Sequence, residues 1–276
     1  MRSKKLKSWN DAVAESIKFG FSDESIANLI GELADLVDSH ISTMIIYSKD
    51  AKPYWPFKSR MSEREWKSLS LRYRNGAYLL DPYYHLSEGK YEGVFCLKDN
   101  VPDEFNETEF YRVFYEAVDV VDEMCAIIQL SDDISAIVSV CRVDSQSVYE
   151  TWAFDYMYSC YSILDVIVKK WWYEKQKDRF DKTVSFGPQL GCALDNFGSS
   201  LLTPRETQVA RLLLEGHSVK AQAKILNIGA ETIKSYKKSL YQKLDIRSQS
   251  ELFNVFIEAL KIYDPDKSLD PLSTYL

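Results

Sequence analysis

Residues 202–248 constrain the fold of this chain more than any other stretch, because they carry the start and stop signals of successive short helices. Thr203 is a good N-cap, Pro204 suits the first helical position, and Glu206 three residues after the cap completes a capping box. Gly216 supplies the left-handed conformation that is common just past a helix end. The pattern predicts a first helix that begins at about Thr203 and ends at 215–217.

Two further helices follow the first across tight turns. Ser218 is placed to cap a second short helix, and residues 227–229 form a turn before a third helix opens near Ala230. The apolar residues of the third helix share one face, at spacings of seven and four: Ile233, Leu240 and Leu244. The opposite face carries Glu231, Lys234, Ser235, Lys238 and Gln242. These residues predict a packed helical head that exposes one polar helix face.

The charge of the chain is unevenly distributed. The formal net charge is −7, yet residues 200–262 hold ten basic and six acidic residues, a balance of +4. The first 199 residues carry −9. Between residues 232 and 247, four Lys and one Arg stand against one Asp. Because basic side chains neutralise phosphates, this distribution predicts that residues 200–262 alone face double-stranded DNA.

The block resembles the C-terminal four-helix domain of LuxR-type (NarL/FixJ-type) transcription regulators over about a fifth of the chain. The matching motifs are Leu202-Thr-Pro-Arg-Glu206, Glu215-Gly-x-Ser218, Thr232-Ile-Lys234 and Lys243-Leu-x-Ile-Arg-Ser248. The resemblance implies that bases of an operator are contacted by Lys234, Ser235 and Lys238. It implies that the DNA backbone is contacted by Thr232, Tyr236, Lys237 and Arg247, and we expect Lys243 to contact phosphates as well.

Three positions depart from the pattern of that family. Lys220-Ala-Gln-Ala223 stands where relatives usually carry Lys-Glu-Ile-Ala, so Gln222 replaces an expected core Ile. A buried amide without a partner costs roughly 1–3 kcal/mol. Either Gln222 is hydrogen-bonded or this helix pair packs unusually. Gly229, in place of Ser or Thr, is a weaker cap for the recognition helix.

The first 180 residues predict helices around a small antiparallel sheet. Helices are expected at 11–20, 23–38, 62–80, 107–122 and 147–180, strands at 41–47 and 91–97, and a hairpin from 125–130 and 135–142. The fold class is therefore an α+β domain followed by an all-α four-helix helix-turn-helix domain. The order of elements resembles PAS/GAF-like sensor domains, and a sheet with helices on one side commonly encloses a ligand pocket.

Aromatic residues are dense between residues 54 and 84, and the candidate ligand-binding residues are Tyr54, Trp55, Trp66, Tyr73, Tyr78 and Asp81. Asp81 precedes a Pro, and acyl-homoserine-lactone receptors line their pocket with a Trp, Tyr residues and an Asp followed by Pro. Here the Trp-x-x-x-Tyr spacing of those receptors is absent, and one residue is missing between the second Tyr and the Asp. Three alternatives remain open: a lactone, another small and partly apolar ligand, or plain core packing of the aromatics.

Domain boundaries follow from these patterns. We expect an α+β ligand-sensing and dimerisation domain at 1–180, a polar linker at 181–200, the helix-turn-helix domain at 201–262 and a loose tail at 263–276. The large apolar residues in the later half of the 147–180 helix exceed what one small domain needs. They favour a partner helix, and a homodimer matches the symmetry of most helix-turn-helix operators.

Several protein classes are excluded. The cysteines, Cys96, Cys125, Cys141, Cys160 and Cys192, are scattered, which predicts reduced thiols rather than zinc or disulfide frameworks. No nucleophile elbow, phosphate loop or paired His and Cys occurs, so we expect neither catalysis, nor a metal, nor a cofactor. No apolar run approaches the roughly 20 residues that span a bilayer. The chain is expected to be cytoplasmic and to have no membrane partner.

The leading hypothesis is a ligand-responsive, dimeric transcription regulator. A phosphorylation-driven response regulator would need an alternating βα receiver, which the pattern lacks. A sigma-factor-like protein would need a DNA-melting domain, and nothing in the sequence supplies one. Two alternatives stay open: an acyl-homoserine-lactone quorum-sensing receptor, and a ligand-free regulator controlled by a protein partner.

Overall fold

The computed structural model describes residues 2–48, 51–59, 63–143, 147–176, 193–264 and 270–275. Contacts divide the chain into two compact units. Unit 1 comprises Met1–Lys67, Pro82–Asn100 and Val118–Ser185. Unit 2 comprises Ser68–Asp81, Val101–Ala117 and Phe186–Leu276, so two segments from the first half of the chain group with the C-terminal residues. No helix of the described residues is long and apolar enough to cross a bilayer.

Unit 1 is built on an antiparallel sheet. Its strands in the described residues are β1 (Ile41–Ser48), β2 (Ala51–Ser59), β3 (Gly93–Cys96), β4 (Val120–Ser131) and β5 (Ile134–Val143), in the order β2-β1-β5-β4-β3. The predicted hairpin is confirmed as β4 and β5, which pair from Val120 opposite Val143 to Ser131 opposite Ile134. The central residues of β4 and β5 are buried on both faces, so both faces of the sheet centre are covered.

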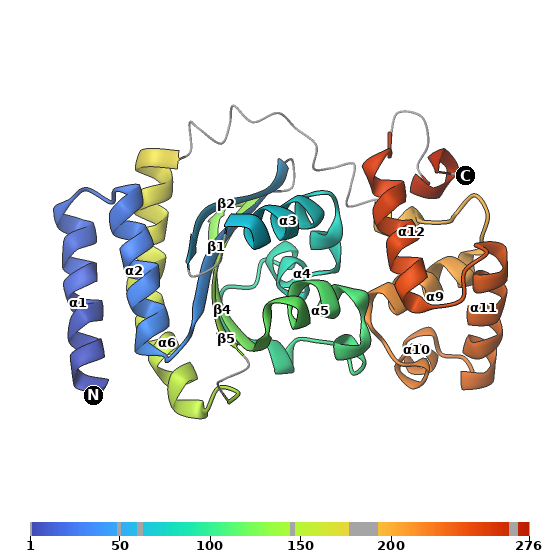
Figure 1. Cartoon of the computed structure of the whole chain (residues 1–276), viewed down its shortest axis with the longest axis horizontal. Coiled ribbons are helices and arrows are strands. Elements are labelled where there is room, and N and C mark those ends of the chain that lie inside the picture. Colours follow the sequence, from blue (N-terminus) through green and yellow to red (C-terminus); the bar gives the residue numbers. More distant parts are fainter. Residues whose placement is uncertain are drawn as a thin grey trace. The chain divides into compact units, whose positions relative to one another are not determined.

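The helices α2 (Asp23–Leu36) and α6 (Thr151–Trp171) cover one face of this sheet, and α1 (Arg2–Lys18) packs on α2 (Figure 1). Ser22 caps α2 by accepting a hydrogen bond from the backbone N–H of Ser25. α2 contacts β1, β2 and β5, and α6 contacts β3 and β4. The inward faces of both helices share one core with even-numbered residues of β4 and β5. This core contains, among others, Ile26, Leu29, Ile30, Leu33, Met124, Ala126, Ile128, Val138 and Val140. The predicted helix 23–38 and strand 41–47 are confirmed.

The long helix differs from its prediction. It begins at Thr151 rather than 147, and a π turn over Trp172–Gln176 follows α6, while residues 177–180 lie outside the described residues. Trp171 and Trp172 are 0% and 1% exposed within the core of unit 1, and Trp171 Nε1 donates to Asp23 Oδ1 at 2.8 Å. Its own chain therefore covers the two tryptophans, whereas Val166 in the same half is 52% exposed, so a partner helix stays a prediction.

Other element boundaries also differ. α1 begins at Arg2 rather than Asp11, so the basic residues before Asp11 belong to the same helix. Strand β2 was missed, since its two prolines argue against a strand; it is an edge strand, where Pro is tolerated. The predicted helix 62–80 is observed as the shorter helix α3 (Glu63–Arg74). It stops before Gly76, whose φ of +131° is incompatible with a helix. A 3₁₀ turn (Ala77–Leu80) and α4 (Pro82–Glu88) follow.

The predicted helix 107–122 is broken into short pieces. Thr108 caps α5 (Glu109–Phe114), a 3₁₀ turn spans Glu116–Val118, and β4 begins at Val120. The spacing of the aromatic residues suits a helix. In the structure their rings pack against one another, and the helix ends at Phe114. Tyr111 and Tyr115 stack with ring centroids 5.4 Å apart and an interplanar angle of 5°.

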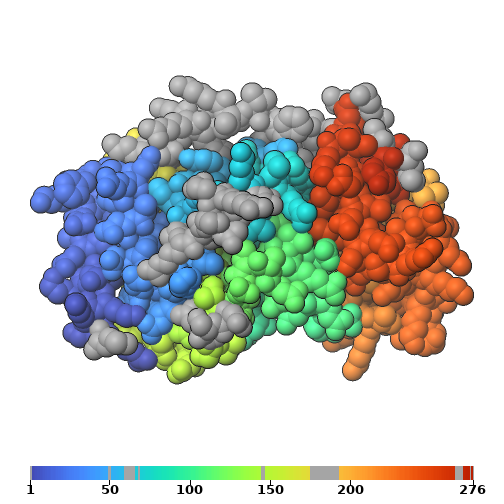
Figure 2. Space-filling model, in the orientation of Figure 1, coloured from blue at the N-terminus to red at the C-terminus, as the bar shows by residue number. Residues whose placement is uncertain are grey.

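Unit 2 contains the predicted helical head as α9 (Pro204–Glu215), α10 (Val219–Leu226), α11 (Ala230–Lys243) and α12 (Gln249–Lys261). The start and stop signals act as predicted. Thr203 and Glu206 form the capping box, Gly216 has φ +90°, Ser218 accepts from the Ala221 N–H, and Asn227 is left-handed. The side chains of these helices, orange to red in Figure 2, pack into one continuous mass. The two-domain fold class is confirmed.

The end of the chain is not the predicted loose tail where the structure describes it. Asp270 is 3% exposed and Leu272 is 0% exposed. The Asp270 carboxylate accepts hydrogen bonds from Gly198 N at 2.8 Å and from Ser200 N at 2.7 Å. These bonds fasten residues 270–275 to the start of the helical head. Most of the predicted linker, residues 181–192, lies outside the described residues.

Candidate nucleic-acid interface and ligand site

A buried carboxylate joins the first helix of the head to α11. Glu206 is 3% exposed, and its carboxylate accepts from Thr203 N at 2.7 Å, Ser239 Oγ at 2.6 Å and Lys243 Nζ at 2.7 Å. Burial raises the pKa of this carboxyl, but the hydrogen bonds from Lys243, Ser239 and Thr203 outweigh burial and lower the pKa to about 2. The carboxylate is therefore charged at neutral pH and holds α9 against α11.

The outer face of α11 is polar and exposed, as predicted. Ile233 and Leu240 are 0% exposed on its inner face, whereas Lys234, Ser235 and Lys238 are exposed. Lys234 Nζ lies 2.7 Å from Glu231 Oε1, and both side chains are largely in solvent. Such a surface pair contributes at most about 1 kcal/mol, so a phosphate or a base edge can replace Glu231 at little cost.

A shallow hollow of about 540 Å³ lies on the outer side of α11. Its lining residues are Val219, Lys234, Lys237, Lys238, Tyr241, Gln242, Asp245 and Ile246. The hollow therefore joins the first turn of α10 to the lysines of α11. Three lysines against one aspartate make it a surface for an anionic partner.

The remaining predicted DNA contacts lie around this face. Thr232 and Arg247 are exposed, and Tyr236 and Lys237 are half-buried. Lys237 Nζ lies 5.6 Å from the centroid of the Tyr241 ring. Lys243 differs from the others, because its ammonium is bound to Glu206. Its role at the DNA backbone stays a prediction, and Lys243→Ala would change stability as well as any phosphate contact.

The predicted ligand residues fall into two sets. In unit 2, Tyr73, Tyr78 and Asp81 are 5%, 3% and 7% exposed, and the Tyr73 hydroxyl donates to Asp81 Oδ2. The Tyr73 ring contacts those of Tyr78, Phe110 and Phe114 at centroid distances between 5.4 and 6.4 Å. This group, with Phe105, is called the aromatic cluster below. It places one buried carboxylate among aromatic rings.

The other three ligand candidates belong to unit 1. The Trp55 and Trp66 rings meet edge to face at 5.4 Å, and Lys58 Nζ lies 5.1 Å from the Trp66 centroid. Tyr54 is 42% exposed on β2. The six residues are thus split between the units, which the sequence pattern did not anticipate because it treats residues 54–84 as one stretch.

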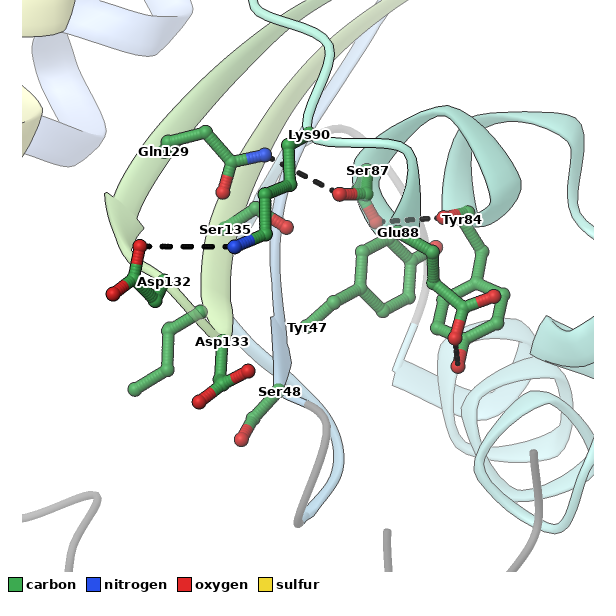
Figure 3. Close-up of a pocket in the computed structure, with 11 residues that line it drawn as sticks. Tyr47, Ser48, Tyr84, Ser87, Glu88, Lys90, Gln129, Asp132, Asp133 and Ser135 are labelled. Carbon is green, nitrogen blue, oxygen red and sulfur yellow. Dashed lines mark hydrogen bonds and ion pairs between the residues drawn. The ribbon is translucent and has the colours of Figure 1, made fainter. Parts of the chain in front are cut away.

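Sequence reasoning did not select the pocket at one end of the sheet in unit 1 (Figure 3). The pocket has a volume of about 210 Å³ and is lined mainly by β1, β4, β5 and α4, with Tyr47, Tyr84, Glu88, Lys90, Asp132 and Asp133 among its residues. Tyr47 and Tyr84 meet edge to face at 5.2 Å, and Lys90 Nζ lies 3.7 Å from Asp132 Oδ1. Of these residues, Tyr84 lies in the aromatic-rich stretch, and Asp132 and Asp133 lie in the turn of the predicted hairpin, where acidic residues need no function.

Residues 200–256 match the family model described as bacterial regulatory proteins, luxR family. They form a LuxR-family domain. An HTH-type transcriptional regulator from the exeN 3′ region of Aeromonas salmonicida is 29% identical over 186 residues, covering 65% of this chain and 94% of that protein. The transcriptional regulatory protein RcsB of Escherichia coli is 37% identical over 71 residues, covering 26% of this chain and 32% of that protein.

A solved structure also resembles more than half of the chain. The VqsR LBD domain from Pseudomonas aeruginosa has a TM-score of 0.53 and 21% sequence identity, covering 61% of this chain and 98% of that chain. A likeness at 21% identity is evidence for a shared fold and for nothing further. It agrees with the α+β class expected for the first part of the sequence.

The structure shows the consequence of two departures from the family pattern, Gln222 and Gly229. Gln222 is 0% exposed, and its Nε2 donates to the His217 carbonyl oxygen at 2.7 Å. Its Oε1 has no hydrogen-bond partner among the described residues, so the amide is half satisfied. Gly229 provides no side-chain cap for α11, as expected for glycine.

The described residues contain no group of three or more His, Cys, Asp and Glu side chains that could hold a metal ion. Four of the cysteines are free thiols, with Cys125, Cys141 and Cys160 buried and Cys96 half-buried. Burial raises the pKa of the Cys96 and Cys160 thiols to about 11, so both are protonated at neutral pH. Cys192 lies outside the described residues.

Proposed function

We propose that this chain is a transcription regulator that binds double-stranded DNA through α11 and acts in the cytoplasm. The observation that carries the proposal is the exposed face of Lys234, Ser235 and Lys238 on the recognition helix of a LuxR-family domain. Lys234 and Lys238 can donate to base edges, and the flanking Thr232, Tyr236, Lys237 and Arg247 supply backbone contacts. The relatives named as transcription regulators support the same conclusion.

Selection from a random duplex library tests this function. The full chain is incubated with the library at physiological salt, and bound DNA is sequenced after several rounds. We expect enrichment of a two-fold symmetric operator that binds at least about a thousand times tighter than random DNA. Recovery of random sequence only would contradict the proposal.

The second part of the proposal is that the regulator acts as a homodimer. Most operators of helix-turn-helix proteins are palindromic, which requires two recognition helices related by two-fold symmetry. The solvent face of α6 offers apolar surface, with Tyr158 65% and Val166 52% exposed and the Phe154 and Tyr158 rings stacked at 6.2 Å. Sedimentation of the full chain with and without its operator measures the stoichiometry directly.

The third part is control by a small, partly apolar molecule. Asp81 favours the aromatic cluster as the site, because a buried carboxylate among rings offers an acceptor that a ligand N–H or O–H can share with Tyr73. An acyl-homoserine lactone is one candidate, since its receptors use a Trp, Tyr residues and an Asp. Control by a protein partner is the alternative if no small molecule binds.

A thermal-shift screen of lactones, small aromatic acids and amines decides between them. A ligand of the aromatic cluster is expected to raise Tm by several degrees, and Asp81→Asn is expected to remove the shift while preserving side-chain volume. Asp132→Asn is the matched control, because this carboxylate lines the other pocket and its side chain is 98% exposed. A shift abolished by Asp132→Asn instead would move the site to the pocket of Figure 3. No shift with any class of ligand would favour the protein partner.

A further inference from the structure

An acidic segment lies against the turn between α9 and α10. The acidic segment, residues 103–109, contains Asp103, Glu104, Glu107 and Glu109 and no basic residue. It belongs to unit 2, as do all the helices of the LuxR-family domain.

Backbone and side chains of the acidic segment contact this turn directly. Asp103 Oδ2 accepts from Ser218 Oγ at 2.6 Å, and Asp103 Oδ1 accepts from Ser218 N at 3.1 Å. Glu104 N donates to the Gly216 carbonyl oxygen at 3.0 Å. A Cβ atom at Gly216 would lie 2.6 Å from Thr108 Cγ2 and 3.0 Å from Phe105 Cα, so only glycine permits this approach. The segment therefore fits closely on the turn.

Asp103 occupies a position suited to a phosphate. Ser218 is the N-cap of α10, where exposed N–H groups and the helix dipole favour an anion. Helix N-termini and hydroxyl groups are common donors to DNA phosphates. The hydrogen bonds from the Ser218 side chain and backbone lower the pKa of the Asp103 carboxyl, which keeps it anionic. Its side chain is exposed, so an incoming anion can displace it.

The same position adjoins the DNA-binding face of α11. Val219, the residue after Ser218, lines the hollow that also contains Lys234 and Lys238. Burial and the negative charges of Glu107 and Asp103 raise the pKa of Glu104, and the positive charge of Lys237 on α11 acts in the opposite direction. A DNA backbone that follows the lysines of α11 would pass the site that Asp103 fills.

We propose that the acidic segment is a built-in competitor of DNA, in which Asp103 takes the place of a phosphate at the N-terminus of α10. This inference rests on the proposed function, since it assumes that DNA binds along α11. Specific binding then requires the segment to leave the turn, and the resting chain binds its operator less tightly than the helical head allows.

The anchor of the segment connects this competitor to the aromatic cluster. Phe105 is 2% exposed, and its ring contacts that of Phe110 at 6.1 Å. Phe110 contacts Tyr73, whose hydroxyl donates to Asp81. A molecule that changes the packing around Asp81 also acts on the rings that hold the acidic segment in place. Its binding can therefore change how readily the segment leaves the turn.

Asp103→Ala in the full chain tests the proposal by operator binding. The substitution is expected to tighten binding about 3- to 30-fold, the range for a charge-assisted hydrogen bond at an exposed site. Glu107→Ala is the matched control, because it removes the same charge from an exposed side chain of the same segment. Its expected effect is less than about twofold. Equal affinity of Asp103→Ala and wild type, or equal gains in both variants, would overturn the proposal.

Hydrogen exchange on the wild-type chain gives an independent measurement that does not depend on a variant folding. Operator DNA is expected to accelerate exchange at the amide of Glu104, because its bond to Gly216 opens when the segment leaves. Unchanged or slower exchange there in the DNA complex would refute displacement. A wild-type chain that binds no DNA would instead disprove the proposed function, so the two failures are distinguishable.

Discussion

Glu206→Ala is expected to destabilise the LuxR-family domain by about 2–4 kcal/mol, since it removes a capping box and several buried hydrogen bonds at once. The Glu206 carboxylate is 3% exposed and links Thr203 at the start of α9 to Ser239 and Lys243 on α11. Its loss leaves the Thr203 N–H, the Ser239 hydroxyl and the Lys243 ammonium without this acceptor, so only the Thr203 hydroxyl still caps α9. Urea unfolding at pH 7 measures the loss.

The pH dependence follows from the same residue. The folded pKa of Glu206 is about 2, below its ordinary value of 4.5. A depressed carboxyl pKa contributes stability that is fully present above the unfolded value and is lost as the pH falls through the folded value. Wild type is therefore expected to lose stability between about pH 4.5 and pH 2. Glu206→Ala lacks this contribution at every pH, so its stability should fall less over that window.

Glu258→Ala is the matched control for this prediction. Glu258 lies on α12, and its side chain is 50% exposed beside Lys261. Removing one partner of such a surface pair is expected to change the free energy of unfolding by less than about 1 kcal/mol. If Glu206→Ala and Glu258→Ala lost the same free energy of unfolding, the buried hydrogen bonds of Glu206 would contribute nothing beyond an exposed ion pair.

The second large effect concerns the operator. Lys234→Ala and Lys238→Ala are each expected to weaken specific binding by about 1–3 kcal/mol, or about 5- to 150-fold, because each removes a donor from the exposed face of α11. The double variant should retain the folding stability of wild type, since both side chains are exposed. Fluorescence anisotropy with the selected operator and with random DNA measures the two affinities.

Lys261→Ala controls for the loss of positive charge. Lys261 lies on α12, outside the lining of the hollow on α11, and is paired with Glu258. It should change operator affinity by less than about twofold at physiological salt, where exposed charges beyond a Debye length of about 8 Å are screened. If the double variant bound the operator as tightly as Lys261→Ala does, the orientation of α11 proposed here would be wrong.

Local signals account for the accuracy of the prediction in the C-terminal region. The capping box at Thr203, the left-handed Gly216 and the cap at Ser218 each act over three or four residues, so their neighbours in sequence are also their partners in space. The inner and outer faces of α11 follow from helix geometry in the same way. Periodicity alone placed Ile233 and Leu240 inside and Lys234 and Lys238 outside.

Prediction failed where distant contacts override local preference. Residues 107–122 carry a helical spacing of aromatics, yet the helix stops at Phe114 because the rings pack into a cluster and β4 begins six residues later. β2 contains two prolines that a central strand would exclude, but its place at the edge of the sheet tolerates them. The long helix was expected to begin at residue 147, but α6 begins at Thr151, after Tyr149 has packed into the core.

The sequence by itself determined the helical head, its caps and its basic outer face, because each depends on residues within a few positions of one another. The fold class followed from the periodicity of successive segments. Only the tertiary structure decided that Lys243 binds Glu206, 37 residues away, and that Asp103 binds Ser218, 115 residues away. It also decided that the ligand candidates divide between two units. Such pairs are set by how helices and segments pack, and no periodicity along the chain records which distant carboxylate will meet which donor.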